Sequence, residues 1–331
     1  MAGKTNIEWT EQSWNPIVGC SIVSPGCTNC YAMKMAHRLQ AMADKPRWTK
    51  KGVGTGHYAG TTKVVNGNAV WTGKLALAPS HVLTAPLRRK KPTTYFVNSM
   101  GDLFHEDCPD EWILDALTIM AIARQHTFQV LTKRAERMRD FMSNPDLLQE
   151  IMVNWWSFDD GMRGVESWPL PNVWLGVSTE DQRRADDRIP HLLATPTAVR
   201  FVSAEPLLGP INLTHIDLPG GDEEIFPLGW PEGRDDEPCH PHLDWVIAGG
   251  ESGPNARPMH PDWARSLRDQ CEAARVPFFF KQWGEWGPYD RSRHDGATLA
   301  TPFSTDMPLQ RFGKKLAGRL LDGTEHNGVP A

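Results

Sequence analysis

The chain has 331 residues, of which 40% are hydrophobic and 23% charged, and its formal net charge is −5. A chain of this length can bury a sizeable core, and its composition excludes disorder throughout. No run of about 18 apolar residues is present, so the sequence predicts no membrane span. The first residues lack the apolar stretch of a signal peptide, and we expect a soluble, cytoplasmic protein.

Charge is distributed unevenly along the chain. Between residues 32 and 91 there are twelve Lys and Arg side chains and one acid, Asp44, so this segment carries +11 and the remainder −16. A basic segment of this kind could follow the phosphate backbone of a nucleic acid, with Arg88-Arg-Lys-Lys91 just before a strand. It could equally offset the acidic remainder within one domain, and the sequence leaves both interpretations open.

Short β-rich segments alternate with helical patterns. A first strand is predicted near residues 14–19, and a second at 93–98 is followed by a helix over about 109–124. Further strands are predicted at 127–132, 173–178, 198–203, 244–248 and 277–281, with helical segments at 135–153, from a Ser178 or Thr179 cap through Arg188, and at 262–274. About seven strands alternating with helices predict a parallel sheet built from right-handed βαβ units.

Polar residues follow most of the predicted strands. They are Asn98-Ser99, Thr132-Lys133, Ser178-Thr179-Glu180, Ser203-Ala204-Glu205, Gly249-Gly250-Glu251-Ser252 and Lys281-Gln282. The carboxyl ends of parallel strands share one edge, where α/β folds place their active sites. We therefore expect a partial (β/α) TIM-type barrel, which brings many strand ends to one mouth, with Lys133, Glu205 and Lys281 as candidate catalytic residues. Alternatively, these side chains could cap the following helices.

The domain prediction is one barrel domain over residues 1–331 with two insertions and an extension. A basic, glycine-containing insertion is expected at about 40–91, and an acidic, turn-rich insertion at 214–243. Periodicity is lost from about residue 287, which predicts an irregular carboxyl-terminal extension.

Three of the six cysteines lie within eleven residues, at Cys20, Cys27 and Cys30. In a reducing compartment such a group indicates metal or redox chemistry rather than disulfides. Three thiolates can hold a [4Fe-4S] cluster and leave one iron open to an outside ligand. A structural zinc ion is the alternative, with His37 as the fourth ligand, and unliganded buried thiols are a third interpretation.

Several motifs along the chain resemble those of a known group of phage and bacterial proteins. They are Ile7-Glu-Trp-Thr-Glu-Gln-Ser-Trp-Asn-Pro-Ile-Val-Gly-Cys20, Pro25-Gly-Cys-Thr-Asn-Cys-Tyr-Ala32, Phe96-Val-Asn-Ser-Met-Gly-Asp-Leu-Phe104, Val130-Leu-Thr-Lys-Arg134, Trp174-Leu-Gly-Val-Ser178, Arg200-Phe-Val-Ser-Ala-Glu-Pro-Leu-Leu208 and Phe280-Lys-Gln-Trp-Gly284. From residue 7 to about 323 the chain resembles the phage gene-product 37/68 family, which is largely uncharacterised.

More remotely, the chain resembles the radical S-adenosylmethionine (SAM) superfamily, particularly its spore photoproduct lyase branch. Members of that branch follow the last cluster cysteine with a Tyr-Ala-like pair and carry a Ser-x-x-Asp after the second strand. The matching residues here are Tyr31-Ala32 and Ser99-Met-Gly-Asp102. The cysteine spacing departs from the superfamily pattern, because six residues rather than three separate Cys20 from Cys27.

The resemblance implies a cofactor and a reaction class. Cys20, Cys27 and Cys30 would ligate a [4Fe-4S] cluster at the barrel mouth, and its open iron would chelate the amino and carboxylate groups of SAM. Reduction of the cluster would then cleave SAM to methionine and a 5′-deoxyadenosyl radical. An electron donor such as a flavodoxin or ferredoxin is implied, with DNA or a nucleotide as the candidate substrate.

The resemblance also indicates which residues contact SAM. Ser99 and Asp102 correspond to the position that binds the SAM amino group, although the same residues could form an Asx-type turn. Asn98 and Tyr31 lie in the matching motifs and are further candidates for contact with SAM. Ser178 and Glu251 are candidates because each lies at the carboxyl end of a predicted strand, not because of the resemblance. The Gly-Gly-Glu motif of the superfamily follows the second strand, whereas Gly249-Gly-Glu251 follows about the sixth, so that family role does not transfer.

One more cysteine is a candidate participant in radical chemistry. Cys108 precedes a predicted helix near the same edge, where its thiol could donate a hydrogen atom to a product radical, or simply be partly buried. The alternative function for the whole chain is a zinc-stabilised nucleic-acid-binding protein without catalysis.

Overall fold

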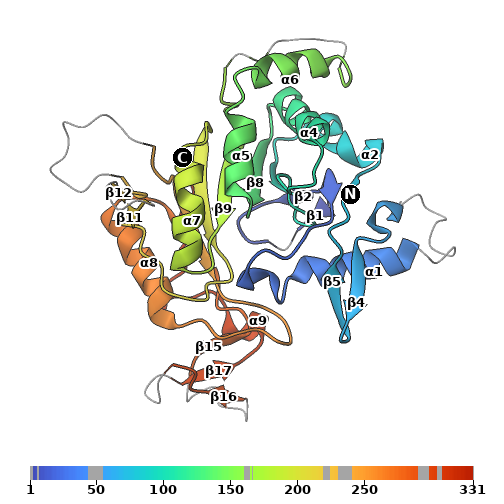
Figure 1. Cartoon of the computed structure of the whole chain (residues 1–331). Coiled ribbons are helices and arrows are strands. Elements are labelled where there is room, and N and C mark those ends of the chain that lie inside the picture. Colours follow the sequence, from blue (N-terminus) through green and yellow to red (C-terminus); the bar gives the residue numbers. More distant parts are fainter. Residues whose placement is uncertain are drawn as a thin grey trace, which may run out of the picture. The chain divides into compact units, whose positions relative to one another are not determined.

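The computed structural model describes residues 3–5, 7–43, 55–159, 165, 167–218, 224–229, 241–289, 298–303 and 308–330. Contacts within the chain group it into two compact units. Unit 1 comprises Met1–Gly176 with Thr195–Ala198, and unit 2 comprises Val177–Ala194 with Val199–Ala331. Figure 1 labels their helices and strands in chain order.

A mostly parallel sheet is the framework of the fold. Its strand order is β1 (Gly3–Lys4), β2 (Gln12–Trp14), β7 (Thr94–Val97), β8 (Thr127–Thr132), β9 (Val173–Ser178), β10 (Val199–Ala204), β13 (Trp245–Gly249) and β14 (Phe278–Gln282). The short β1 pairs antiparallel with β2, whereas β2–β7, β7–β8, β10–β13 and β13–β14 pair in parallel. The fold is therefore mixed α/β with a parallel sheet, consistent with the predicted partial barrel.

Most strand predictions agree with the structure, and β8 and β9 have the predicted bounds. The first predicted strand is divided. Gln12–Trp14 joins the main sheet as β2, whereas β3 (Ile17–Val18) turns away and pairs antiparallel with β6 (Ala76–Leu77). This division places the end of β3 directly before the first cysteine of the loop.

Two predictions about helices were wrong. The helix expected over 135–153 is two helices, α5 (Ala135–Met142) and α6 (Leu147–Trp155). Pro145 lies between them, and a proline disfavours helical backbone at the residue before it. The helix α7 (Gln182–Leu193) is capped by Asp181, whose carboxylate accepts the N–H of Arg184 at 3.1 Å, rather than by Ser178 or Thr179.

Two apolar clusters fix the part of unit 1 that surrounds the cysteines. Under the sheet, Tyr95 stacks on Phe128 with ring centroids 5.5 Å apart, and Trp14 packs against the same ring. The second cluster joins α1 (Tyr31–Ala43) to η3 (Gly56–Tyr58) and the hairpin β4 (Thr62–Val65)–β5 (Asn68–Trp71). In Figure 1 this hairpin lies beside α1. Cys20 and Cys30 pack against the second cluster, which therefore anchors the cysteine loop.

The segments predicted as insertions are only partly described. Between residue 55 and β7 the chain forms η3, the β4–β5 hairpin, β6, α2 (Ser80–Leu83) and α3 (Ala85–Arg88), whereas residues 44–54 lie outside the described part. In the predicted acidic insertion, β11 (Ile216–Asp217) pairs with β12 (Glu224–Ile225), and residues 219–223 and 230–240 lie outside the description.

The carboxyl-terminal extension, expected to be irregular, contains regular structure. There β15 (Trp286–Pro288), β17 (Leu309–Arg311) and β16 (Leu299–Ala300) form an antiparallel sheet, followed by α9 (Lys314–Ala317). The remaining helices are α4 (Asp110–Ile122) in unit 1 and α8 (Pro261–Ala273) in unit 2. Within the described residues, no helix has both the length and the apolar character needed to cross a membrane.

Candidate functional site

The cysteine loop begins at a glycine that no other residue could replace without displacing backbone. Gly19 has φ +98°, and a Cβ at this position would lie 2.1 Å from the carbonyl oxygen of Lys74. Its N–H donates to the carbonyl of Met100 at 3.1 Å, and it forms a parallel bridge with Gly101. The residue before Cys20 is thereby held against the loop that follows β7.

The other two cysteines are placed by local structure. Cys27 ends the 3₁₀ turn η1 (Pro25–Cys27), and its N–H donates to the carbonyl of Ser24 at 2.9 Å. Cys30 directly precedes α1, where the backbone N–H groups of Ala32 and Met33 act to lower the pKa of its thiol. An N–H-rich helix start favours negative charge, so this position suits a thiolate ligand.

The three sulfurs are close enough to affect one another's ionisation, Cys20 with Cys30 and Cys30 with Cys27. Burial, together with the Asp102 carboxylate and against the opposing effect of Arg134, raises the pKa of the Cys20 thiol to about 12. Burial also raises the pKa of Cys30. Such thiols are protonated at neutral pH and make poor nucleophiles, whereas a bound cation can displace their protons.

The arrangement bears on which metal group the loop could hold. Across the described ranges, no three His, Cys, Asp or Glu side chains are placed to hold a single metal ion. His37, the expected fourth zinc ligand, instead has its Nδ1 3.3 Å from the Oγ1 of Thr62. A zinc ion requires its ligands to converge on one point, whereas each cysteine of a four-iron cluster binds a different iron. Three soft sulfur donors without a convergent fourth ligand fit the cluster better than zinc.

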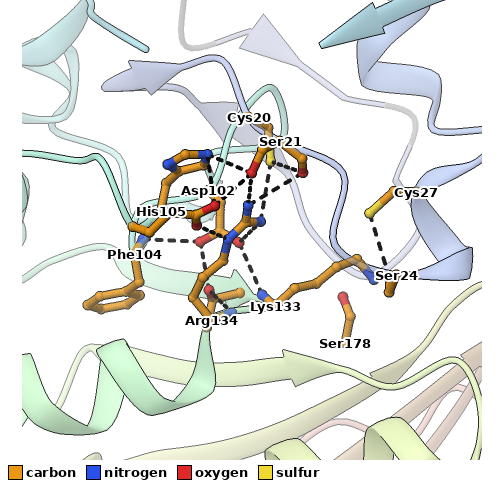
Figure 2. Close-up of polar contacts among 12 residues, drawn as sticks. Cys20, Ser21, Ser24, Cys27, Asp102, Phe104, His105, Lys133, Arg134 and Ser178 are labelled. Atoms are coloured by element: carbon orange, nitrogen blue, oxygen red, sulfur yellow. Dashed lines mark hydrogen bonds and ion pairs between the residues drawn. The ribbon is translucent and has the colours of Figure 1, made fainter. Parts of the chain in front are cut away.

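An arginine that sequence reasoning missed contacts the first cysteine (Figure 2). Arg134 follows β8, and its side chain is only 8% exposed. Its Nη1 donates to the sulfur of Cys20 at 3.4 Å and to Asp102 Oδ2 at 3.2 Å. Its Nε donates to Glu106 Oε2 at 2.8 Å, and its Nη2 to Ser21 Oγ at 2.6 Å. One side chain thus joins the cysteine loop to the loop after β7.

Asp102 is the centre of the loop after β7. Its Oδ1 accepts the hydroxyl of Thr132 at 2.6 Å and the N–H of Phe104 at 3.1 Å. Its Oδ2 accepts the N–H of Lys133 at 3.1 Å as well as the Arg134 guanidinium. The contact with Phe104 is the Asx-type turn named above as the alternative. An ammonium group from SAM would have to displace one of these four donors, so the contacts favour a positioning role for Asp102.

A chain of hydrogen bonds fixes Ser21 as well. His105 is fully buried, and its Nδ1 accepts the N–H of Asp107 at 3.1 Å, which leaves the proton on Nε2 to donate to Ser21 Oγ at 2.9 Å. Burial and the charge of Arg134 lower the pKa of His105, so the ring is neutral. Ser21 donates in turn to Glu106 Oε1 at 2.8 Å. Although burial raises the pKa of Glu106, its bonds with Arg134 and Ser21 bring it down to about 2.

The other predicted SAM contacts in unit 1 lie at the carboxyl end of β7. Asn98 has φ +58°, and its side-chain amide bonds the backbone of Ile17 in either orientation. Ser99 Oγ donates to Asn15 Oδ1 at 3.1 Å, and the hydroxyl of Tyr31 donates to the Ser99 carbonyl at 3.0 Å. The structure therefore brings Ser99 and Tyr31 together, whereas Asn98 joins two backbone segments.

Two further candidates of unit 1 differ in where they lie. Lys133 directly follows β8. Its positive charge lowers the pKa of Cys30, so its ammonium group lies near that sulfur. Cys108 is buried before α4, where its thiol donates to the carbonyl of Pro109 at 3.7 Å. Burial raises the pKa of Cys108 to about 12. These contacts assign Cys108 to the packing at the start of α4.

The candidates of unit 2 form two separate ion pairs. Lys281 Nζ lies 3.0 Å from Glu205 Oε1, and Ser203 Oγ donates to Glu205 Oε2 at 3.1 Å. Arg257 donates three hydrogen bonds to the Glu251 carboxylate, from its backbone N–H at 2.8 Å, its Nε at 2.9 Å and its Nη2 at 2.6 Å.

The last candidate of unit 2, Ser178, ends β9. Its carbonyl accepts from Arg188 Nη1 at 2.7 Å, and the same guanidinium nitrogen lies 3.1 Å from Glu180 Oε2. The residues that follow β9 are thus held by a buried ion pair of their own unit.

The basic segment is divided by the fold. Lys34 and Arg38 lie on α1, which directly follows Cys30, and Lys63 lies on β4, which packs against α1. Arg88–Lys91 precede β7 and so lie at the amino end of that strand, away from the loop at its carboxyl end. Lys45, Arg47, Lys50 and Lys51 of the same segment lie outside the described residues.

Residues 4–330 match the model of a family described as a protein of unknown function (DUF5131), and the chain belongs to that family. No curated protein and no solved structure matches it.

Proposed function

We propose that this member of the family is a radical SAM-type enzyme on a partial (β/α) barrel, with a [4Fe-4S] cluster held by Cys20, Cys27 and Cys30. The observation that carries the proposal is the gathering of three mutually interacting thiols on one loop beside the carboxyl end of β7. Active sites of such α/β folds lie at that end of the strands.

The surroundings of the sulfurs support a cluster. Cys30 lies at the N–H-rich start of α1, and Cys20 accepts a guanidinium N–H. Hydrogen bonds of this kind stabilise thiolate ligands and adjust the potential of a bound cluster. The loop packs against the apolar cluster of α1, which limits access of water and oxygen to the sulfurs.

When bound, the cluster supplies the electron and the open coordination position for reductive cleavage of SAM. The chain's own residues would hold and orient the two groups. Ser99 and Tyr31 would contact SAM, while Asn98 and Asp102 fix the backbone around them. Lys133 would offset the negative charge of the thiolates. A flavodoxin or ferredoxin would supply the electron in the cell.

A nucleic acid or nucleotide is the proposed substrate class. The described residues of 20–43 and 55–91 contain no Asp or Glu side chain, while Lys34, Arg38 and Lys63 lie on α1 and β4. The cations on α1 and β4 favour phosphate groups. Binding of single-stranded DNA should weaken steeply as salt is raised, and K34E/R38E should abolish it without changing iron content.

Anaerobic reconstitution tests the proposed function. The protein should become brown, bind about four irons per chain, and release 5′-deoxyadenosine from SAM when dithionite is added. Cys30→Ala should lose nearly all iron and all activity, because two thiolates cannot hold the cluster. The matched control is Cys108→Ala, which removes a buried thiol outside the loop and should keep the cluster.

Two outcomes contradict the proposal. A colourless protein with one zinc per chain would favour the zinc-stabilised nucleic-acid-binding protein. A brown protein that does not cleave SAM, in wild type and Cys30→Ala alike, would make the cluster a structural element.

A further inference from the structure

We propose that Arg134 is a positioning residue that holds Cys20 in the geometry of a cluster ligand and, through its N–H···S bond, raises the reduction potential of the bound cluster. The effect on the potential rests on the function proposed above. The effect on the position of Cys20 does not, because it concerns contacts that exist without a cluster.

The three cysteines are not held in the same way. Cys27 and Cys30 are fixed by neighbours in sequence, through the η1 turn and the start of α1. The Cys20 thiol donates to the carbonyl of its neighbour Ser21 at 3.4 Å, whereas the donor to its sulfur is Arg134, 114 residues away along the chain. Six residues separate Cys20 from Cys27, so the turns that place Cys27 and Cys30 do not place the first sulfur. The arginine supplies the missing restraint from outside the loop.

Only arginine has the donors that this position uses. Its Nε, Nη1 and Nη2 point to three groups on two segments, namely Glu106, the Asp102–Cys20 pair and Ser21 (Figure 2). The guanidinium is planar and rigid, so these bonds fix the loops relative to each other. A lysine ammonium would keep the charge but could not reach all of these partners together.

The same contact sets the direction of the effect on the potential. A donor N–H and a positive charge beside a ligand sulfur stabilise the reduced, more negative cluster, which raises the potential. Without Arg134, the carboxylates of Asp102 and Glu106 would lose their main counter-charge. The loss of the N–H···S bond and the loss of this counter-charge both lower the reduction potential of the cluster.

The first experiment uses the metal-free protein. Wild type, Arg134→Lys, Arg134→Met and the control Arg139→Gln are treated with iodoacetamide, and each cysteine is followed by mass spectrometry. Arg139 lies on α5, which follows Arg134, and is paired with Asp140. Alkylation requires the loop to open, and in the open loop the Arg134 contact is already broken. Removing the arginine should therefore raise the alkylation rate of Cys20 about tenfold, and Arg134→Lys should raise it less.

Cys271, fully buried in α8 of unit 2, is the internal reference for unfolding of the whole chain. If the alkylation rate of Cys271 rises as much as that of Cys20, or if the rate of Cys20 rises in neither variant, the positioning role is wrong. Arg139→Gln should leave both rates unchanged.

The second experiment is a redox titration of the reconstituted proteins, followed by electron paramagnetic resonance. In Arg134→Met the equilibrium constant for reduction of the cluster should fall about tenfold, which lowers the potential by about 59 mV for a one-electron couple. The potential of Arg134→Lys should fall less. A potential equal to that of wild type in both variants overturns the tuning role. If wild type itself takes up no cluster, the proposed function fails, and the alkylation experiment still decides whether Arg134 positions Cys20.

Discussion

Polar side chains follow the strands in both units, but they are bonded differently. In unit 1, Arg134 after β8 donates both to Asp102 after β7 and to the sulfur of Cys20. In unit 2, Glu205 directly after β10 bonds Lys281, which lies near the end of β14. A polar residue at a strand end is thus a weak indicator of a site by itself. What distinguishes unit 1 is that its ion pairs hold a loop that carries three thiols.

The largest expected effect is on the buried carboxylate of unit 1. Asp102→Ala should lower the free energy of unfolding by about 3–5 kcal/mol, because it leaves the buried Arg134 without its innermost partner. Urea denaturation at neutral pH measures this, with Asp140→Ala as an exposed control that should change stability by less than about 0.5 kcal/mol. A loss below about 1 kcal/mol for Asp102→Ala would show that the network is not well ordered.

A smaller effect is expected for the corresponding pair in unit 2. Glu205→Ala should cost about 1–2 kcal/mol, because Lys281 is 17% exposed and can turn its ammonium group towards water. The same urea titrations compare it with Asp102→Ala. If Glu205→Ala proved the more costly substitution, the contrast between the units would be reversed.

The smallest expected effect is a pH dependence that comes from Glu106. Its pKa is lowered from 4.5 to about 2 in the folded chain, so the stabilisation is complete above about pH 4.5 and is lost as the pH falls towards 2. The side chain is 52% exposed, and solvent screening limits the contribution to about 1 kcal/mol or less. Glu106→Gln should flatten this part of the stability curve, measured by urea denaturation between pH 5 and 2.5. An unchanged slope would show that the ionised Glu106 carboxylate does not stabilise the folded chain through this network.

Much of the fold was predictable because periodicity and strand composition are local properties. The bounds of β8 and β9, and the alternation that gives a parallel sheet, follow from short segments read one at a time. The errors arose where neighbouring signals compete. Asp181 caps α7 although Ser178 and Thr179 are also suitable residues, and Pro145 divides a helix whose pattern continues on both sides.

The candidate site was predictable in its ligands but not in its supports. Arg134 ends the motif Val130-Leu-Thr-Lys-Arg134, and Ser21 follows the first cysteine, so both were within reach of a sequence reading. His105 and Glu106 carried no such signal. Their contribution depends on the loop after β7 returning to the cysteine loop, which the bridge between Gly19 and Gly101 brings about.

The sequence by itself determined the three thiols, their spacing and the strand ends that precede the candidate residues, because each of these is written in consecutive residues. Only the tertiary structure decided how those residues are used. It bonded Asp102 to four donors, placed Arg88–Lys91 at the amino end of β7 and Lys34 and Arg38 on α1, and placed Arg134 on the sulfur of Cys20. Such contacts join segments that lie far apart in the chain. Whether a buried charge is favourable depends on the partners that those segments supply, and only the folded structure brings them together.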